Sequence, residues 1–86
     1  REVEDALVSV RTYRAENAAR QRQVAAASSA ARLSRARYDG GVTSYLEVLD
    51  IERSLFQSEL AASETRRQEL TAIIQLYKAL GGGWTP

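Results

Sequence analysis

Apolar residues recur in the second half of the chain as two stripes at heptad spacing. The first stripe comprises Leu46, Leu49, Arg53, Phe56, Leu60, Ser63, Arg67, Leu70, Ile74 and Tyr77. The second stripe comprises Val48, Leu55, Ala62, Ile73, Leu76 and Leu80. On a helical wheel the stripes lie nearly opposite each other, whereas a helix that packs on one partner needs a single apolar stripe. Two stripes therefore indicate neighbours on both sides, as in a ring or bundle of helices. The alternative is that one stripe is a mildly apolar surface.

The positions of glycine and proline divide the chain into two long helices. Glycine occurs only at positions 40, 41, 81, 82 and 83, and the single proline is Pro86. Because these residues interrupt helices, they predict a first helix over 1–38, a turn over 39–43, a second helix over 44–80 and a glycine-rich exit segment over 81–86. Each helix would be about 55 Å long, which is much longer than a typical globular helix. The predicted fold is all-α, a long antiparallel helical hairpin with coiled-coil character.

The second helix has clear boundary signals in the sequence. Ser44 and Glu47 form an S-x-x-E capping box, in which the hydroxyl accepts a free backbone N–H and the glutamate reaches back. Thr43 is an alternative cap, one residue earlier. Gly81 stands where a left-handed residue would end the helix. The first helix has no comparable start signal before "REVEDALVSV", which suggests that the chain is part of a longer protein.

The first helix is rich in alanine and turns polar in its middle. It contains ten alanines, which favour helix and allow close approach of helix axes. Near its start, Val3, Leu7 and Val10 form an apolar stripe. In the same heptad phase Arg14, Asn17 and Gln21 follow. This polar section either faces solvent or lines a wet interior.

The composition argues against catalysis and against nucleic-acid binding. The chain has no histidine, the commonest general base and metal ligand, and no cysteine for a disulfide or a thiolate metal site. We therefore expect neither an enzyme nor a cofactor. Net charge is +1, which is not the pattern of a nucleic-acid binder. Residues 1–38 hold eight arginines against four acids, and residues 44–80 hold four basic against six acidic residues. These arms of opposite sign can attract each other, although most such charges are expected to be solvated.

No apolar run in the sequence is long enough to span a membrane. A hairpin of this size gains only about 3–5 kcal/mol from its core. We therefore expect the isolated chain to be marginally stable or to self-associate.

Two segments resemble a known family. The segments "ARYDGGVTSYLEVLD" and "LYKALGGGW", joined by an amphipathic helix, resemble the outer-membrane efflux proteins of the TolC/OprM type. The second segment is similar to the lipoprotein branch that works with resistance–nodulation–division (RND) pumps. The resemblance runs over essentially the whole chain.

The resemblance implies a role as one part of a larger assembly. Members of the family are trimers with a long α-helical barrel in the periplasm, and this chain resembles the hairpin of the second structural repeat. The implied location is the periplasmic portion of an outer-membrane protein. The implied partners are two further copies, a periplasmic adaptor (membrane fusion) protein at the turn and, indirectly, an inner-membrane RND-type pump.

The resemblance also assigns candidate sites. The turn that would contact the adaptor comprises Tyr38, Gly40, Gly41, Val42 and Thr43. The residues that would border a closable aperture are Leu46, Glu47, Asp50 and Arg53. Trp84 would be a packing anchor at the far end.

Each of these assignments has a simpler alternative. Taken by itself, such a turn is more commonly a helix–helix turn without a partner. Leu46, Asp50 and Arg53 share one helical face, and in a trimer Asp50 and Arg53 would act as a latch, yet the same spacing also describes an ordinary surface ion pair. The alternative function is a free-standing helical hairpin that serves as an oligomerisation or adaptor module.

Overall fold

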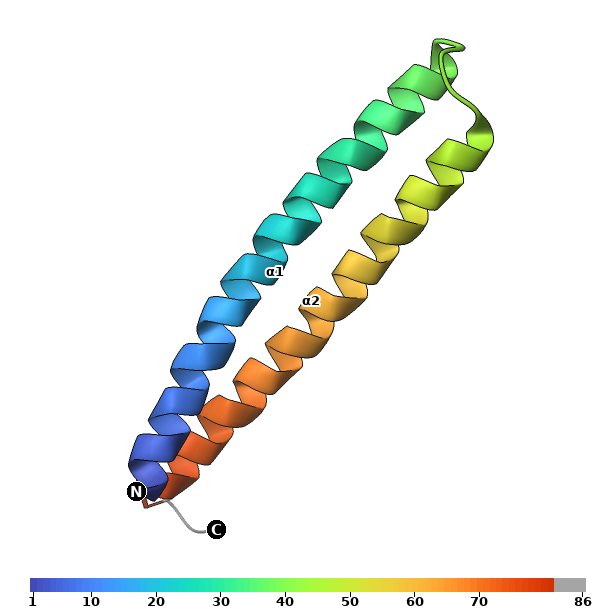
Figure 1. The fold of residues 1–86 in the computed structure, drawn as a ribbon. Helices are drawn as coiled ribbons and strands as arrows, with labels where there is room; N and C mark the ends of the chain where they lie inside the picture. The colour runs from blue at the N-terminus through green and yellow to red at the C-terminus, as the bar shows by residue number, and fades with distance from the viewer. Residues whose placement is uncertain (82–86) are drawn as a thin grey trace.

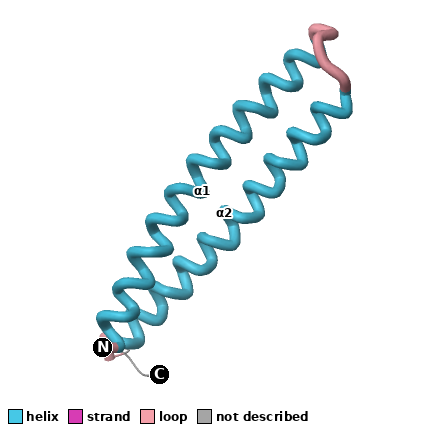
Figure 2. Tube along the Cα trace, in the orientation of Figure 1, coloured by secondary structure: helices cyan, strands magenta, loops and turns pink. Residues whose placement is uncertain are grey.

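The computed structural model describes residues 1–81 and consists of two long antiparallel helices joined by a short turn (Figure 1). Helix α1 spans Glu2–Asp39 and helix α2 spans Tyr45–Ala79. The pair is 61 Å long and only 13 Å across its thinnest dimension. Figure 2 shows both helices running without interruption from the turn to the opposite end, where the N-terminus lies beside the end of α2. The predicted all-α helical hairpin is confirmed.

The two helices meet along a seam with alternating spacings of three and four residues, which is the geometry of a coiled coil. From α1 the seam takes Val3, Ala6, Val10, Tyr13, Asn17, Arg20, Val24, Ala27, Ala31 and Ser34. From α2 it takes Val48, Ile51, Leu55, Ser58, Ala62, Thr65, Glu69, Ala72, Leu76 and Ala79. All of these residues are buried or half-buried. Because most are small or polar, the two helices bury little apolar area against each other.

The second predicted stripe of α2 forms much of this seam, with two differences. Val48, Leu55, Ala62 and Leu76 lie in it as expected. Ile73 and Leu80 do not, because the spacing places the neighbouring alanines, Ala72 and Ala79, against α1 instead. The inner face of α2 is therefore smaller in side-chain volume than the sequence pattern indicates.

The first predicted stripe of α2 points away from α1. Its large members are exposed in the chain, among them Leu46, Leu49, Phe56, Leu60, Leu70, Ile74 and Tyr77. No helix among residues 1–81 is both long and apolar enough to cross a membrane.

The middle of the seam is polar. Asn17 donates from Nδ2 to Glu69 Oε1 at 3.0 Å, and Arg14 Nε lies 3.6 Å from Glu69 Oε2. Thr65, which is only 2% exposed, donates to Glu16 Oε2 at 3.4 Å. Of the predicted polar section only Asn17 lies in the seam, whereas Arg14 and Gln21 are exposed. The hydrogen bonds of Asn17 and Thr65 satisfy groups that would be costly to bury unpaired.

Candidate functional site at the hairpin turn

The turn begins with a Schellman motif at the end of α1. Gly40 is the C-cap, and Gly41 follows in a left-handed conformation with φ +76°. Gly41 N–H donates to Tyr38 O at 2.9 Å, and Val42 N–H donates to Arg37 O at 2.8 Å. These two bonds satisfy the last carbonyls of the helix and reverse the chain within two residues. A Cβ at Gly41 would meet no neighbour, so only its positive φ calls for glycine.

The cap of α2 completes the turn. Ser44 adopts an extended conformation. Its hydroxyl accepts the Glu47 N–H at 3.3 Å, as the capping box predicts. The other half of the box differs from the prediction, because the Glu47 carboxylate accepts a hydrogen bond from the Thr43 hydroxyl. The Glu47 charge also lies in the first turn of α2, where the helix dipole favours an anion.

The five predicted contact residues of the turn lie together but offer different surfaces. Gly40, Gly41 and Val42 form its exposed apex, and the Val42 side chain is 67% exposed. Thr43 is half-buried and engaged with Glu47. Tyr38 continues the seam spacing after Ser34. The apex therefore presents two glycine backbones and one apolar side chain, a surface that another backbone can approach closely.

A cluster that the sequence interpretation missed braces one flank of the turn. The rings of Tyr38 and Tyr45 are tilted by 53° with centroids 5.2 Å apart. The guanidinium of Arg35 lies 5.7 Å from the centroid of the Tyr45 ring, and its Nη2 donates to Glu52 Oε2 at 3.0 Å. The hydrogen bond with Glu52, followed by the charge of Glu52, raises the pKa of Arg35. Arg35 and Tyr38 share one face of α1, and Tyr45 and Glu52 share one face of α2. These two spacings are the only sign of the cluster in the sequence.

The opposite flank of the turn is open. A shallow groove there is lined by Ala30, Leu33, Ser34, Arg37, Glu47 and Ile51. Ser34 is 2% exposed and its hydroxyl has no hydrogen-bond partner. The two flanks of the turn thus differ, one filled by aromatic rings and an ion pair, the other hollow.

The predicted aperture residues lie on the first turns of α2 and point away from α1. Leu46 is 77% exposed, and Asp50 and Arg53 are exposed on the same face. Within residues 1–81, Asp50 and Arg53 form no ion pair with each other. Leu46, Asp50 and Arg53 are the start of the outward stripe, so the aperture candidates and the unpartnered apolar face are one continuous surface.

The ion pairs between the helices partly follow the predicted charge difference between the arms. Within residues 1–81 two of them cross the seam, Arg35–Glu52 and Arg14–Glu69, and each joins an arginine of α1 to a glutamate of α2. Most other arginines of α1 are exposed. In the described part of the chain, direct attraction between the arms is therefore concentrated at these two points.

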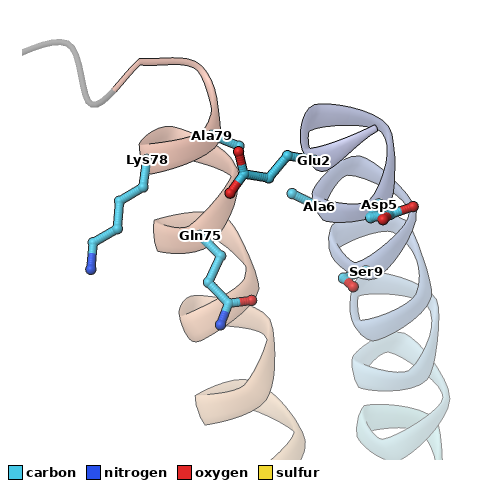
Figure 3. Close-up of a pocket in the computed structure, with 7 residues that line it drawn as sticks. All are labelled: Glu2, Asp5, Ala6, Ser9, Gln75, Lys78 and Ala79. Atoms are coloured by element: carbon cyan, nitrogen blue, oxygen red, sulfur yellow. The ribbon is translucent and has the colours of Figure 1, made fainter.

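The far end of the hairpin has another concavity, between the start of α1 and the last turns of α2. Figure 3 shows Glu2 reaching from α1 toward Ala79 of α2, while Lys78 points away. The full lining is Glu2, Asp5, Ala6, Ser9, Gln75, Lys78 and Ala79. No group of three metal-ligating side chains gathers anywhere in the described part of the chain. Trp84, the predicted packing anchor, lies outside the described residues.

The hairpin thus combines a glycine apex, a side-chain cap at the start of α2 and an apolar stripe exposed along α2. The sequence model of the family described as Outer membrane efflux protein matches residues 1–82. The chain therefore belongs to the outer membrane efflux protein family. The predicted family is confirmed, and with it the assignment to a protein of the outer membrane.

Curated relatives match almost the whole chain. It is 40% identical to the outer membrane protein OprJ of Pseudomonas aeruginosa over 84 residues, which are 98% of this chain and 18% of OprJ. It is 41% identical over 85 residues to the toluene efflux pump outer membrane protein TtgI of Pseudomonas putida, covering 99% of this chain and 18% of TtgI. It is 40% identical over 84 residues to the cation efflux system protein CusC of Escherichia coli O157:H7, covering 98% of this chain and 18% of CusC.

The chain spans about 18% of the length of these relatives. No solved structure matches it. The name of TtgI describes a component of a toluene efflux pump, and that of CusC a component of a cation efflux system.

Proposed function

We propose that the chain is the periplasmic α-helical hairpin of an outer-membrane channel in a tripartite drug or solute efflux system. In this role α1 and α2 are two helices of a tunnel wall built from a homotrimer, and the parent belongs to the lipoprotein branch of the family. The observation that carries the proposal is the outward stripe of α2. A helix with its largest apolar residues turned away from its partner in the hairpin is suited to a position between two neighbours.

The turn is the proposed docking point for a periplasmic adaptor protein. Its apex of Gly40, Gly41 and Val42 is exposed at the end of the hairpin, and Tyr38 and Thr43 flank it. Glycine backbones and a small apolar side chain suit close packing against the end of another helical hairpin. An inner-membrane RND-type pump then supplies the energy through the adaptor, and the hairpin itself performs no chemistry.

The first turns of α2 are the proposed aperture. Three-fold symmetry turns Leu46 into an apolar ring, Asp50 into an acidic ring and Arg53 into a basic ring, with Glu47 bordering them. Asp50 and Arg53 make no ion pair with each other within residues 1–81, and both are exposed, which leaves them free to pair with a neighbouring copy in the proposed trimer. Such pairs would hold the aperture closed until adaptor binding separates the helices.

The isolated chain is proposed to self-associate through the same outward stripe. A free-standing oligomerisation module would share this property. The family match, which covers residues 1–82, favours the channel segment.

Single-channel conductance of the full-length parent in planar bilayers tests the aperture. Asp50→Ala and Arg53→Ala should each raise conductance, because each removes one side of the pairs that hold the rings together. Arg66→Ala, at an exposed arginine outside the stripe, is the matched control and should leave conductance unchanged. If conductance is the same for both aperture variants and the unmodified protein, the latch is wrong.

A further inference from the structure

At the turn-side end of the hairpin the seam ends in a polar residue on α1 and a fully buried valine on α2. The last seam residues there are Ser34 of α1, whose buried hydroxyl has no partner, and Val48 of α2. The hydrogen bonds of Thr65 with Glu16 and of Asn17 with Glu69 lie far down the shaft. Of Ser34 and Val48 only Val48 contributes apolar burial, so a polar contact beside the seam can add to what holds the first turns of α2 against α1.

Arg35 is placed to do this. It sits one turn before Tyr38 on α1 and reaches across to α2, where it contacts two residues seven positions apart. Its guanidinium lies 5.7 Å from the Tyr45 ring centroid and its Nη2 is 3.0 Å from Glu52 Oε2. The Tyr45 ring in turn packs on Tyr38, with centroids 5.2 Å apart. The contacts run without a break from α1 to the first residue of α2 and back to the last turn of α1.

We propose that Arg35 is a positioning residue for the turn, which holds the start of α2 against α1 through Tyr45 and Glu52. This arrangement fixes where Gly41 and Val42 project. The biological purpose of this role rests on the proposed adaptor docking at the turn. The positioning itself is a property of the hairpin and can be tested without an adaptor.

The chemistry of arginine suits this task better than that of lysine. A planar guanidinium can lie against an aromatic face while its N–H groups donate in the guanidinium plane, so one side chain satisfies Tyr45 and Glu52 together. An ammonium is a compact charge and cannot make both contacts with the same geometry. Both Arg35 and Glu52 are partly exposed, so the cluster acts as a local brace and contributes little to overall stability.

The brace lies on one flank of the turn only. The other flank is the open groove beside Ser34, between Arg37 and Glu47. If Arg35 is removed, this hollow flank offers little resistance to movement of Tyr45 and the cap at Ser44 away from α1. The predicted consequence is local loosening of the turn with the two helices still paired along the shaft.

Amide hydrogen exchange of the full-length parent, measured by mass spectrometry without any partner present, tests this role. Arg35→Ala should raise exchange about fivefold in peptides covering residues 39–50. These peptides contain the hydrogen-bonded amides of Gly41, Val42 and Glu47. Peptides covering residues 58–72 should exchange as before. Arg35→Lys and Glu52→Gln should give smaller increases in the turn peptides.

The matched control is Arg32→Ala. Arg32 is also exposed and donates to Ser29 Oγ at 3.3 Å, but this bond lies within α1 and does not cross the seam. It should change no peptide around the turn. Unchanged exchange at residues 39–50 in Arg35→Ala, or an equal increase along both helices, would overturn the proposal.

The readout separates this role from the proposed function. Adaptor binding to the same variants is measured independently, with a purified periplasmic adaptor and the parent protein. Local loosening without any measurable adaptor binding by the unmodified parent would keep the positioning role and refute docking. Normal adaptor binding by the unmodified parent, together with unchanged exchange in Arg35→Ala, would keep docking and refute the positioning role.

Discussion

The two faces of α2 differ in a direction that is unexpected for a self-sufficient hairpin. The inner face packs on α1 with small or polar side chains, such as Ala62, Thr65 and Ala72, which are at most 5% exposed. The outer face carries leucines, an isoleucine and aromatic rings, and Phe56 is 59% exposed. Each square ångström of apolar surface left in water forgoes about 25 cal/mol. A two-helix protein stable by itself would turn the larger stripe inward.

The contrast indicates that the two faces serve different contacts. Small inner residues let the axes of α1 and α2 approach closely and leave the bulky face free. The outer stripe keeps the alternating spacing of three and four residues that a coiled-coil seam requires, from Leu46 to Tyr77. It therefore has the geometry of a second seam and not of a scattered apolar surface.

The largest effect should come from placing a charge on the inner face. Val48 is fully buried. Val48→Asp therefore puts an unpaired carboxylate into the seam at a cost of at least about 3 kcal/mol, comparable with what so small a core supplies. The isolated chain should lose its helical circular dichroism.

The matched variant two residues away is Leu46→Asp on the outer face. Leu46 is 77% exposed. It lies in the first turn of α2, where an acid is favourable. This chain should keep its helical signal in dilute solution. Equal loss of helix in both variants would contradict the assignment of inner and outer faces.

A smaller effect should follow from enlarging the inner face. Ala72 is 2% exposed in the seam. Ala72→Leu should destabilise the hairpin by about 1–3 kcal/mol, because the two axes must move apart to admit the side chain. Urea unfolding followed by circular dichroism measures this change. Ala18→Leu, on the exposed face of α1, is the control and should cost almost nothing. A stability gain in Ala72→Leu would mean that the inner face is under-packed instead.

The smallest effect is expected from trimming the outer face. Leu70 is 55% exposed. Leu70→Ala should therefore change the free energy of unfolding of the monomer by only about 0.5 kcal/mol or less. Leu55 lies in the half-buried seam, and Leu55→Ala, a truncation of the same size, should cost about 2 kcal/mol. The comparison is made by urea titration at low protein concentration. If the order of the two variants is reversed, the stripes have been assigned to the wrong faces.

Local signals predicted much of the fold because they act over a few residues. The glycines at 40 and 41 place the reversal, the Ser44 hydroxyl caps Glu47 N–H, and Gly81 has the predicted positive φ. The sequence also reveals two stripes on α2. It cannot rank them, since burial energy favours the larger stripe inside, whereas the structure packs the smaller one on α1.

Side-chain contacts in the turn and between the helices were harder to predict. The bond from Thr43 to Glu47 replaces the expected return of the glutamate to the backbone. The Arg35 cluster depends on how α1 and α2 are rotated relative to each other, which no single-helix pattern specifies. The roles of the turn and of Leu46, Asp50 and Arg53 remain predictions from the family resemblance.

Analytical ultracentrifugation of the isolated chain tests most directly whether the outer stripe of α2 is a contact surface. At micromolar concentration the chain should self-associate in a concentration-dependent way, and the double substitution Phe56→Ser and Leu60→Ser should weaken that association while helical circular dichroism persists. Gln57→Ser, on the same helix but outside the stripe, should leave it intact. A folded chain that sediments as a monomer throughout this range would contradict the account.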